Sequence, residues 1–166
     1  MDLMRVTLFS LLCSAMSATL AHGEAAPGRK PALNAAAPLD EKPFGRPGDA
    51  NKVVRTIHID MNDEMEYLPN GLRLKAGDTV RFVVRNSGKA MHELVLGTME
   101  ELKAHAELMR KFPDMEHAEL YMAHVRPGKT EAIVWQFTRP GAFYYGCLVP
   151  GHFEAGMVGI VRVRAN

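Results

Sequence analysis

Short segments in which apolar and polar residues alternate follow one another through most of this 166-residue chain. The clearest cover residues 53–61, 72–74 and 80–85, where every second side chain is apolar. A period of two residues is that of a strand with one buried face, and turn sequences such as Asn70-Gly71 separate the segments. Further segments rich in β-branched and aromatic residues cover residues 92–97, 131–137, 142–147 and 157–163. Several short strands joined by turns imply an all-β sandwich or small barrel.

A helical pattern interrupts these strands. Thr98 and Glu101 form the Thr-x-x-Glu pair of a capping box, and apolar residues then recur three or four positions apart. Pro113 is expected to stop this helix, and a second short helical turn is expected from Asp114 to Met122. The sequence therefore predicts a helical insertion within an otherwise all-β domain.

The first 21 residues are predicted to be a secretory signal peptide. Arg5 precedes a short apolar stretch, and small residues follow it. We place cleavage after Ala21, with Gly23 and Ala25 as nearby alternatives. The apolar stretch is too short to cross a bilayer, which needs ~20 residues, and no later stretch comes close, so no membrane span is expected. The mature protein is therefore expected in the periplasm.

A flexible linker is predicted between the signal peptide and the domain. Residues 22–50 hold five Pro, four Gly and seven Ala, with few bulky apolar side chains. Burial therefore cannot offset the entropy of ordering them, and one domain is expected at residues 51–166. The net charge of +1 at neutral pH gives no general attraction to nucleic acid or to an anionic membrane, so neither is expected as a partner.

The most specific chemistry lies in the motif Cys147-x4-His152-x4-Met157. Removal of the signal peptide discards Cys13, so Cys147 has no partner for an internal disulfide. A thiolate, an imidazole and a thioether on one loop between two strand ends can surround a single metal ion. With a second imidazole, these donors form the type of site that holds copper in both oxidation states. The spacing thus predicts a type 1 copper site suited to one-electron transfer.

The second imidazole must come from the other six of the seven histidines. His92 is the preferred candidate because it begins a predicted strand directly after a turn, where a strand end can point at the Cys147 loop. His58 lies in the middle of a strand and is expected to be a solvated sheet residue. A lone histidine is more often structural than a ligand, so this assignment depends on the Cys147 motif. The remaining histidines are His22, His105, His117 and His124.

Histidines and methionines also gather in and after the helical insertion. Imidazole suits Cu(II) and thioether suits Cu(I), so the group could form a second copper site. However, apolar residues at helical spacing usually pack in a core, and we favour packing for the methionines and solvation for the histidines. A second site is therefore a hypothesis at this stage. The residues concerned are His105, Met109, Met115, His117, Met122 and His124.

The chain resembles the cupredoxins, the small blue-copper proteins, over about residues 53–163. The motifs KAGDTVRFVVRN, MHELVLG and FYYGCLVPGHFEAGMVGIVRV carry the resemblance, which is strongest to exported bacterial cupredoxins associated with copper tolerance. It implies a Greek-key β-sandwich with copper near one end, His92, Cys147 and His152 as equatorial ligands and Met157 as the axial ligand. Many cupredoxins follow the first histidine with an asparagine that ties the ligand loops together, whereas here Glu93 follows His92.

Three functions from different classes fit these residues. The first is an electron carrier that docks an unidentified redox partner near His152. The second is a copper-tolerance protein that sequesters or delivers copper, with the additional His and Met residues as helpers. The third is a thiol enzyme with Cys147 as the nucleophile, but Met157 has no role there and no acidic orienting partner is evident. We favour a monomeric, non-enzymatic electron carrier that acts in copper tolerance.

Overall fold

A computed structural model describes residues 41–113, 115 and 117–166 of the chain. The predicted signal peptide and residues 22–40 of the predicted linker lie outside the described residues. In chain order, the elements are β1 (Arg46–Pro47), the 3-10 helix η1 (Ala50–Lys52), β2 (Arg55–Met61), β3 (Tyr67–Leu68), β4 (Gly71–Lys75), β5 (Thr79–Asn86), β6 (His92–Gly97), α1 (Met99–Lys111), β7 (Met122–Val125), β8 (Thr130–Gln136), β9 (Gly141–Gly146) and β10 (Val158–Arg164).

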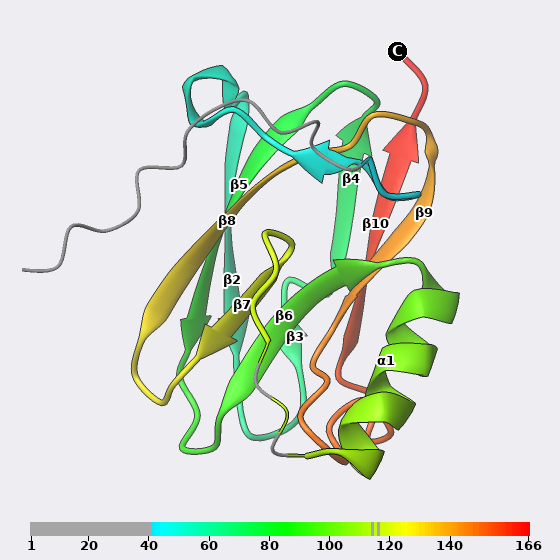
Figure 1. The fold of residues 1–166 in the computed structure, drawn as a ribbon. Coiled ribbons are helices and arrows are strands. Elements are labelled where there is room, and N and C mark those ends of the chain that lie inside the picture. The colour runs from blue at the N-terminus through cyan, green and yellow to red at the C-terminus, as the bar shows by residue number, and fades with distance from the viewer. Residues whose placement is uncertain (1–40, 114, 116) are drawn as a thin grey trace, which may run out of the picture. The chain divides into compact units, whose positions relative to one another are not determined.

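Two five-stranded sheets form the body of the domain (Figure 1). The strand order is β1-β8-β5-β2-β3 in one sheet and β4-β10-β9-β6-β7 in the other. β2 pairs with β5 and β4 pairs with β10 in parallel, while the remaining strand pairs are antiparallel. The prediction of an all-β Greek-key β-sandwich is confirmed, and helix α1 forms the predicted insertion, between β6 and the loop that carries Cys147.

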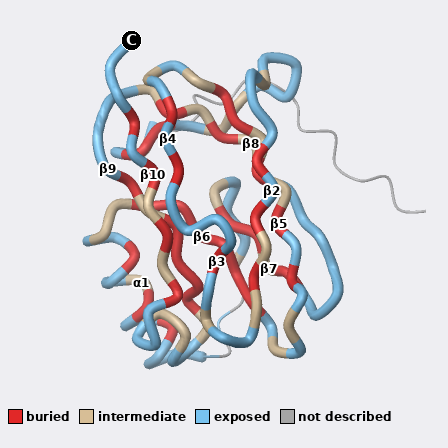
Figure 2. Tube along the Cα trace, turned by 180° about the vertical axis from the view of Figure 1, so that it is seen from behind, coloured by how far each residue is buried: buried red, intermediate tan, exposed pale blue. Residues whose placement is uncertain are grey.

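The alternation seen in the sequence is an alternation of burial. In β2, Ile57 and Ile59 are buried, whereas His58 between them is exposed. Inward-facing side chains from both sheets meet in one apolar cluster that includes Phe82 and Trp135, and the buried parts of the trace run along the facing strands (Figure 2). The prediction that His58 is a solvated sheet residue is confirmed.

Strand β6 is buried along its whole length. One face belongs to the core between the sheets, and helix α1 packs outside β6 and β9 (Figure 1). Val95 thus lies in a second apolar cluster with Leu102, Ala106 and Met109 of the helix. Because both faces of β6 are covered, the first residue of the strand, His92, is held in a water-excluded position.

Helix α1 begins as predicted, with a capping box between Thr98 and Glu101. It ends at Lys111, two residues before Pro113, which is where a proline is expected to stop it. The second helical turn predicted up to Met122 is wrong, because the described residues between α1 and β7 form no helix and Met122 begins a strand that pairs with β6. Within the described part of the chain, no helix is long and apolar enough to cross a membrane.

Residues 44–48, at the end of the predicted linker, pack on the domain. Phe44 is 2% exposed and stacks on Trp135, with the ring centroids 5.2 Å apart. The indole N–H of Trp135 donates to the Phe44 carbonyl at 3.0 Å, and β1 pairs with β8. One aromatic side chain in a segment rich in Pro and Gly provides the burial that the average composition of the segment conceals.

Candidate metal centre

The residues of the Cys147 motif lie on one loop at the end of the second sheet. Cys147 directly follows β9, and Met157 directly precedes β10. The two ends of the loop are joined because the Cys147 N–H donates to the Met157 carbonyl at 3.2 Å. The Met157 N–H in turn donates to the His152 carbonyl at 3.1 Å. Backbone hydrogen bonds therefore hold all three residues of the motif in one compact turn.

His92 reaches the same place from the neighbouring strand. β6 pairs antiparallel with β9, with Val95 opposite Gly146, so the beginning of β6 lies beside the end of β9. The candidate ligand atoms of His92, Cys147 and His152 all lie within 4.8 Å of one another. The predicted choice of His92 is consistent with this geometry, since it brings the side chain to the Cys147 loop.

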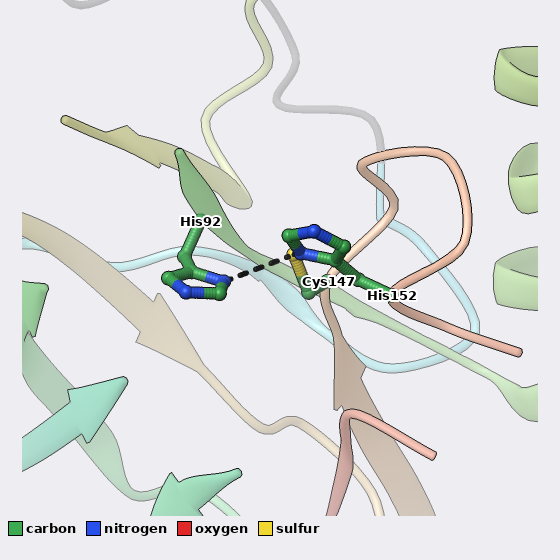
Figure 3. A group of neighbouring side chains, drawn as sticks. All are labelled: His92, Cys147 and His152. Carbon is green, nitrogen blue, oxygen red and sulfur yellow. Dashed lines mark hydrogen bonds between the residues drawn. The ribbon is translucent and has the colours of Figure 1, made fainter. Parts of the chain in front are cut away.

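The cysteine sulfur lies close to both imidazoles, and a dashed line in Figure 3 joins it to the ring of His92. Cys147 Sγ is 3.3 Å from His152 Nδ1 and 4.0 Å from His92 Nδ1, and the centroids of the two rings are 4.9 Å apart. His92 and Cys147 are fully buried, whereas His152 is half-buried. Two nitrogen donors and one sulfur donor thus face a common point, with one side of the group open to the surface at His152.

Met157 is fully buried in the same core cluster as Cys147. Its backbone is fixed beside Cys147 by the hydrogen bond that closes the loop. This placement is compatible with a thioether ligand, and the predicted axial role of Met157 stays a prediction.

Asp63 orients the imidazole of His92. His92 Nε2–H donates to Asp63 Oδ1 at 3.1 Å, which leaves the lone pair of Nδ1 facing Cys147. The backbone N–H groups of Lys89 and Ala90 also donate to this carboxylate, at 2.8 to 3.1 Å. These two amides, followed by His92, lower the pKa of Asp63, so the carboxylate is ionised at neutral pH. A carboxylate on the far nitrogen is the usual partner of a metal-ligating histidine.

The environment keeps the two titratable candidate ligands of the loop, Cys147 and His152, neutral when no metal is bound. Burial raises the pKa of the Cys147 thiol to about 12, although the N–H groups of Glu93 and Val149 partly oppose this shift. Burial also lowers the pKa of His152, and the nearby His92 adds to the effect. A metal ion must therefore displace the thiol proton, so binding is accompanied by proton release. A thiol with so high a pKa is also a poor nucleophile, which disfavours the thiol enzyme.

Glu93 takes part in the site through its backbone and its carboxylate. Its N–H donates to Cys147 Sγ at 3.3 Å, and its carbonyl accepts from the Tyr67 hydroxyl at 2.6 Å. The carboxylate is buried and lies 2.8 Å from His124 Nδ1. Where many cupredoxins have an asparagine, this chain therefore has a buried glutamate that pairs with His124 and whose backbone contacts the Cys147 sulfur.

Sequence analysis missed Asp63 and Asn86. The Asn86 amide donates to the carbonyls of Ala90 and Val125, both at 2.8 Å, and thereby ties the turn before His92 to β7. Neither residue lies at a fixed spacing from the Cys147 motif, so the sequence pattern did not indicate a role for them. The one indication was that Asn86 is a polar residue in the turn before His92.

The remaining candidate residues lie away from this centre. The rings of His105 and His117 are 4.7 Å apart, and those of His117 and His124 are 6.1 Å apart. Met109 and Met122 are buried in the cluster beneath helix α1, as expected for packing, whereas Met115 is exposed. The predicted solvation of the histidines is only partial, because His105, His117 and His124 are all of intermediate exposure.

Comparisons with known proteins agree with this description. Residues 53–164 match the family described as copper binding proteins of the plastocyanin/azurin family. The chain is 48% identical over 162 residues to the copper-resistant cuproprotein CopI of Rubrivivax gelatinosus, covering 96% of this chain and 98% of the relative. It is 33% identical over 120 residues to the CopI of Vibrio cholerae, covering 72% and 71% of the two chains.

The fold is also that of known structures. Dithionite-reduced auracyanin from Roseiflexus castenholzii superposes with a TM-score of 0.59 at 20% identity. The superposition covers 68% of this chain and 98% of the auracyanin chain.

Proposed function

Since this chain belongs to the plastocyanin/azurin family of copper-binding proteins, we propose that His92, Cys147 and His152 hold its copper ion in a type 1 site. Nδ1 of each imidazole, the sulfur of Cys147 and, as the weak fourth donor, the thioether of Met157 would hold the ion. The convergence of the three equatorial side chains within 4.8 Å is the observation that carries this proposal. Two imidazoles, a thiolate and a weak thioether are the donor set that copper adopts in electron-transfer sites.

The donor chemistry fits copper better than the metals that prefer oxygen ligands. Mg²⁺ and Ca²⁺ take carboxylates, carbonyls and water, and no carboxylate is among the proposed donors. When bound, copper supplies a one-electron redox couple. The chain contributes a water-excluded pocket, a fixed tautomer at His92 and backbone N–H donors to the thiolate, all of which favour similar geometry in both oxidation states.

His152 is the proposed route for the electron. It is the one half-buried residue of the three equatorial donors, and the partly exposed side chains of Val149 and Phe153 lie close to it in the loop. Leu148 by contrast is buried and packs beneath helix α1, so it serves the core. A half-buried imidazole with apolar side chains close to it suits brief docking of a redox partner.

We place this site in copper tolerance. The supporting observation is the match over nearly the whole chain to a relative named as a copper-resistant cuproprotein. The predicted signal peptide at residues 1–21 supports a periplasmic location, and we propose that the protein binds copper and exchanges electrons there without turnover of its own. The alternative is a sequestration or delivery protein that uses extra His and Met residues, which the cluster near helix α1 favours.

Deletion of the gene tests the proposed role. We expect the deletion strain to become copper-sensitive, the wild-type gene to restore growth, and a Cys147→Ser gene to fail although the protein is found at normal level in the periplasmic fraction. Full rescue by Cys147→Ser would show that the type 1 site is not needed for tolerance. Unchanged copper tolerance together with slowed respiration would leave only the electron-carrier role.

Replacing Asp63 by asparagine is expected to raise the reduction potential of the copper site. The charge that favours Cu(II) is lost, and Nε2 of His92 loses its anionic acceptor. Loss of such an outer partner weakens metal binding by roughly 10 to 100-fold, and each tenfold loss confined to Cu(II) raises the potential by about 59 mV. Redox titration of the visible band measures the shift.

Glu64→Gln is the matched control for Asp63→Asn. It removes the same charge from the next residue along the chain, whose carboxylate has no hydrogen bond to His92 among the described residues. An equal rise of potential in both variants would indicate a general charge effect and would contradict an orienting role for Asp63.

A further inference from the structure

A second group of metal-binding side chains lines a surface pocket between the end of helix α1 and strands β6 and β7. Three methionines, two histidines and one buried glutamate surround it. Met91 and Met115 are 37% and 38% exposed, and neither contributes to a core cluster. The side chains concerned are those of Met91, Glu93, Met109, Met115, His117 and His124.

His117 has the hydrogen bonding that is typical of a metal-ligating histidine. Its Nδ1 lies 3.3 Å from the Met115 carbonyl, an acceptor, so Nδ1 carries the proton and Nε2 carries the lone pair. Nε2 is buried and has no hydrogen-bond partner among the described residues. Metal-binding histidines typically donate their other N–H to a carbonyl or carboxylate, as His92 does to Asp63 in the first site.

His124 holds His117 in place and is not itself a donor for a metal. Its Nδ1 faces the Glu93 carboxylate at 2.8 Å, and its Nε2 faces the His117 carbonyl at 3.0 Å. Both ring nitrogens therefore lie within hydrogen-bond distance of protein oxygens, which leaves neither directed at a metal. His124 fixes the backbone of His117 instead.

The other donors come from helix α1 and from the segment after it. The ring of His105 lies 4.7 Å from that of His117, which brings a second imidazole beside His117. The thioethers of Met109, one helical turn after His105, and of Met115 line the same pocket as His117.

We propose that His117 Nε2, together with the His105 imidazole and the thioethers of Met109 and Met115, binds a second copper ion as Cu(I). Thioether and neutral imidazole are soft or intermediate donors, and with no carboxylate or thiolate in the set they favour Cu(I) over Zn²⁺ or Mg²⁺. The inference deepens the proposed role in copper tolerance by adding a site for cuprous ion as cargo. The site shares no ligand with the first one, although Glu93 lines its pocket and donates a hydrogen bond to Cys147 Sγ.

Methyl NMR of the folded protein tests the proposal. In Cys147→Ser protein labelled with ¹³C at the methionine methyls, anaerobic titration with Cu(I) is expected to shift the Met109 and Met115 signals together until one equivalent is bound. A chromogenic Cu(I) chelator in competition measures the affinity. His117→Ala is expected to weaken this binding by roughly tenfold or more, since it removes the donor with the free lone pair.

Two further variants make the outcome decisive. Met115→Leu replaces an exposed thioether by a side chain of similar size, so it should fold normally and also weaken Cu(I) binding, whereas His58→Ala on the exposed face of β2 should leave it unchanged. Shifts confined to Met157, or equal affinity in Met115→Leu and wild-type protein, would overturn the second site. With Cu(II), His117→Ala and Met115→Leu should retain the thiolate-to-copper colour of the first site, and its loss would show that the two sites are not separate.

Discussion

Replacing Cys147 by serine is expected to abolish the intense visible absorption of the copper-loaded protein and to weaken copper binding by orders of magnitude. The colour of a type 1 site comes from charge transfer from the thiolate to copper, which no other donor here can replace. Serine keeps the size of the side chain but supplies a hydroxyl, a harder oxygen donor that ionises far less readily than a thiol. The visible spectrum and competition with a chelator of known affinity measure the two effects.

His58→Ala serves as the control for this substitution. His58 is exposed on β2, in the opposite sheet from the Cys147 loop, so both colour and affinity should be unchanged. Persistence of the band in Cys147→Ser would refute the assignment of the thiolate as a ligand. Rapid alkylation of Cys147 in copper-loaded wild-type protein would favour the thiol enzyme instead.

The copper-free protein is expected to lose stability steeply as the pH rises above about 9. The folded chain keeps the Cys147 proton up to a pKa of about 12, whereas an unperturbed thiol loses it near 9.0. The unfolded state thus binds fewer protons in this range, so the free energy of unfolding is fully retained below pH 9 and falls as the pH approaches 12. A difference of three pKa units corresponds to on the order of 4 kcal/mol.

Two buried tyrosines, Tyr67 and Tyr145, are also expected to lower the free energy of unfolding as the pH rises further. Burial raises the pKa of Tyr67 and of Tyr145, so both keep their protons in the folded protein beyond the range in which they lose them in the unfolded chain. Urea unfolding of copper-free protein at about pH 8 and about pH 11 measures the combined loss.

Cys147→Ala is the control that isolates the thiol. The variant retains both tyrosines, so its stability should fall less steeply over the same pH range, whatever its starting value. Copper-loaded wild-type protein should also be less sensitive, because the metal has already displaced the thiol proton. Equal pH dependence in wild-type and Cys147→Ala proteins would contradict the assigned burial of the thiol.

The sequence predicted those strands and that helix in which apolar residues recur at regular spacing. The strands with several alternating residues, such as β2 and β5, were all found, and the capping box located the start of α1. The two-residue strands β1 and β3 are too short to show any alternation. β7 was missed because its four residues are almost all buried, so neither a helical nor a strand period appears in them.

The local part of the metal site could be predicted, whereas its surroundings could not. His152 and Met157 are recognisable because both lie on one loop with Cys147, and His92 because it begins a strand. Asp63 contacts His92 across 29 positions of the chain, and the contact depends on how the turns at the end of the sandwich fold together. Such pairings are set by tertiary structure, for which the residue types alone provide no spacing rule.

The separation of His92 from the Cys147 loop determines when the metal can be captured. Three of the proposed donors are close in sequence, but the fourth arrives only after β6 has paired with β9. A newly made, unfolded chain therefore cannot present the complete donor set. The complete site therefore forms only when folding is finished. The metal ions available in the compartment where the chain folds then decide which ion is bound.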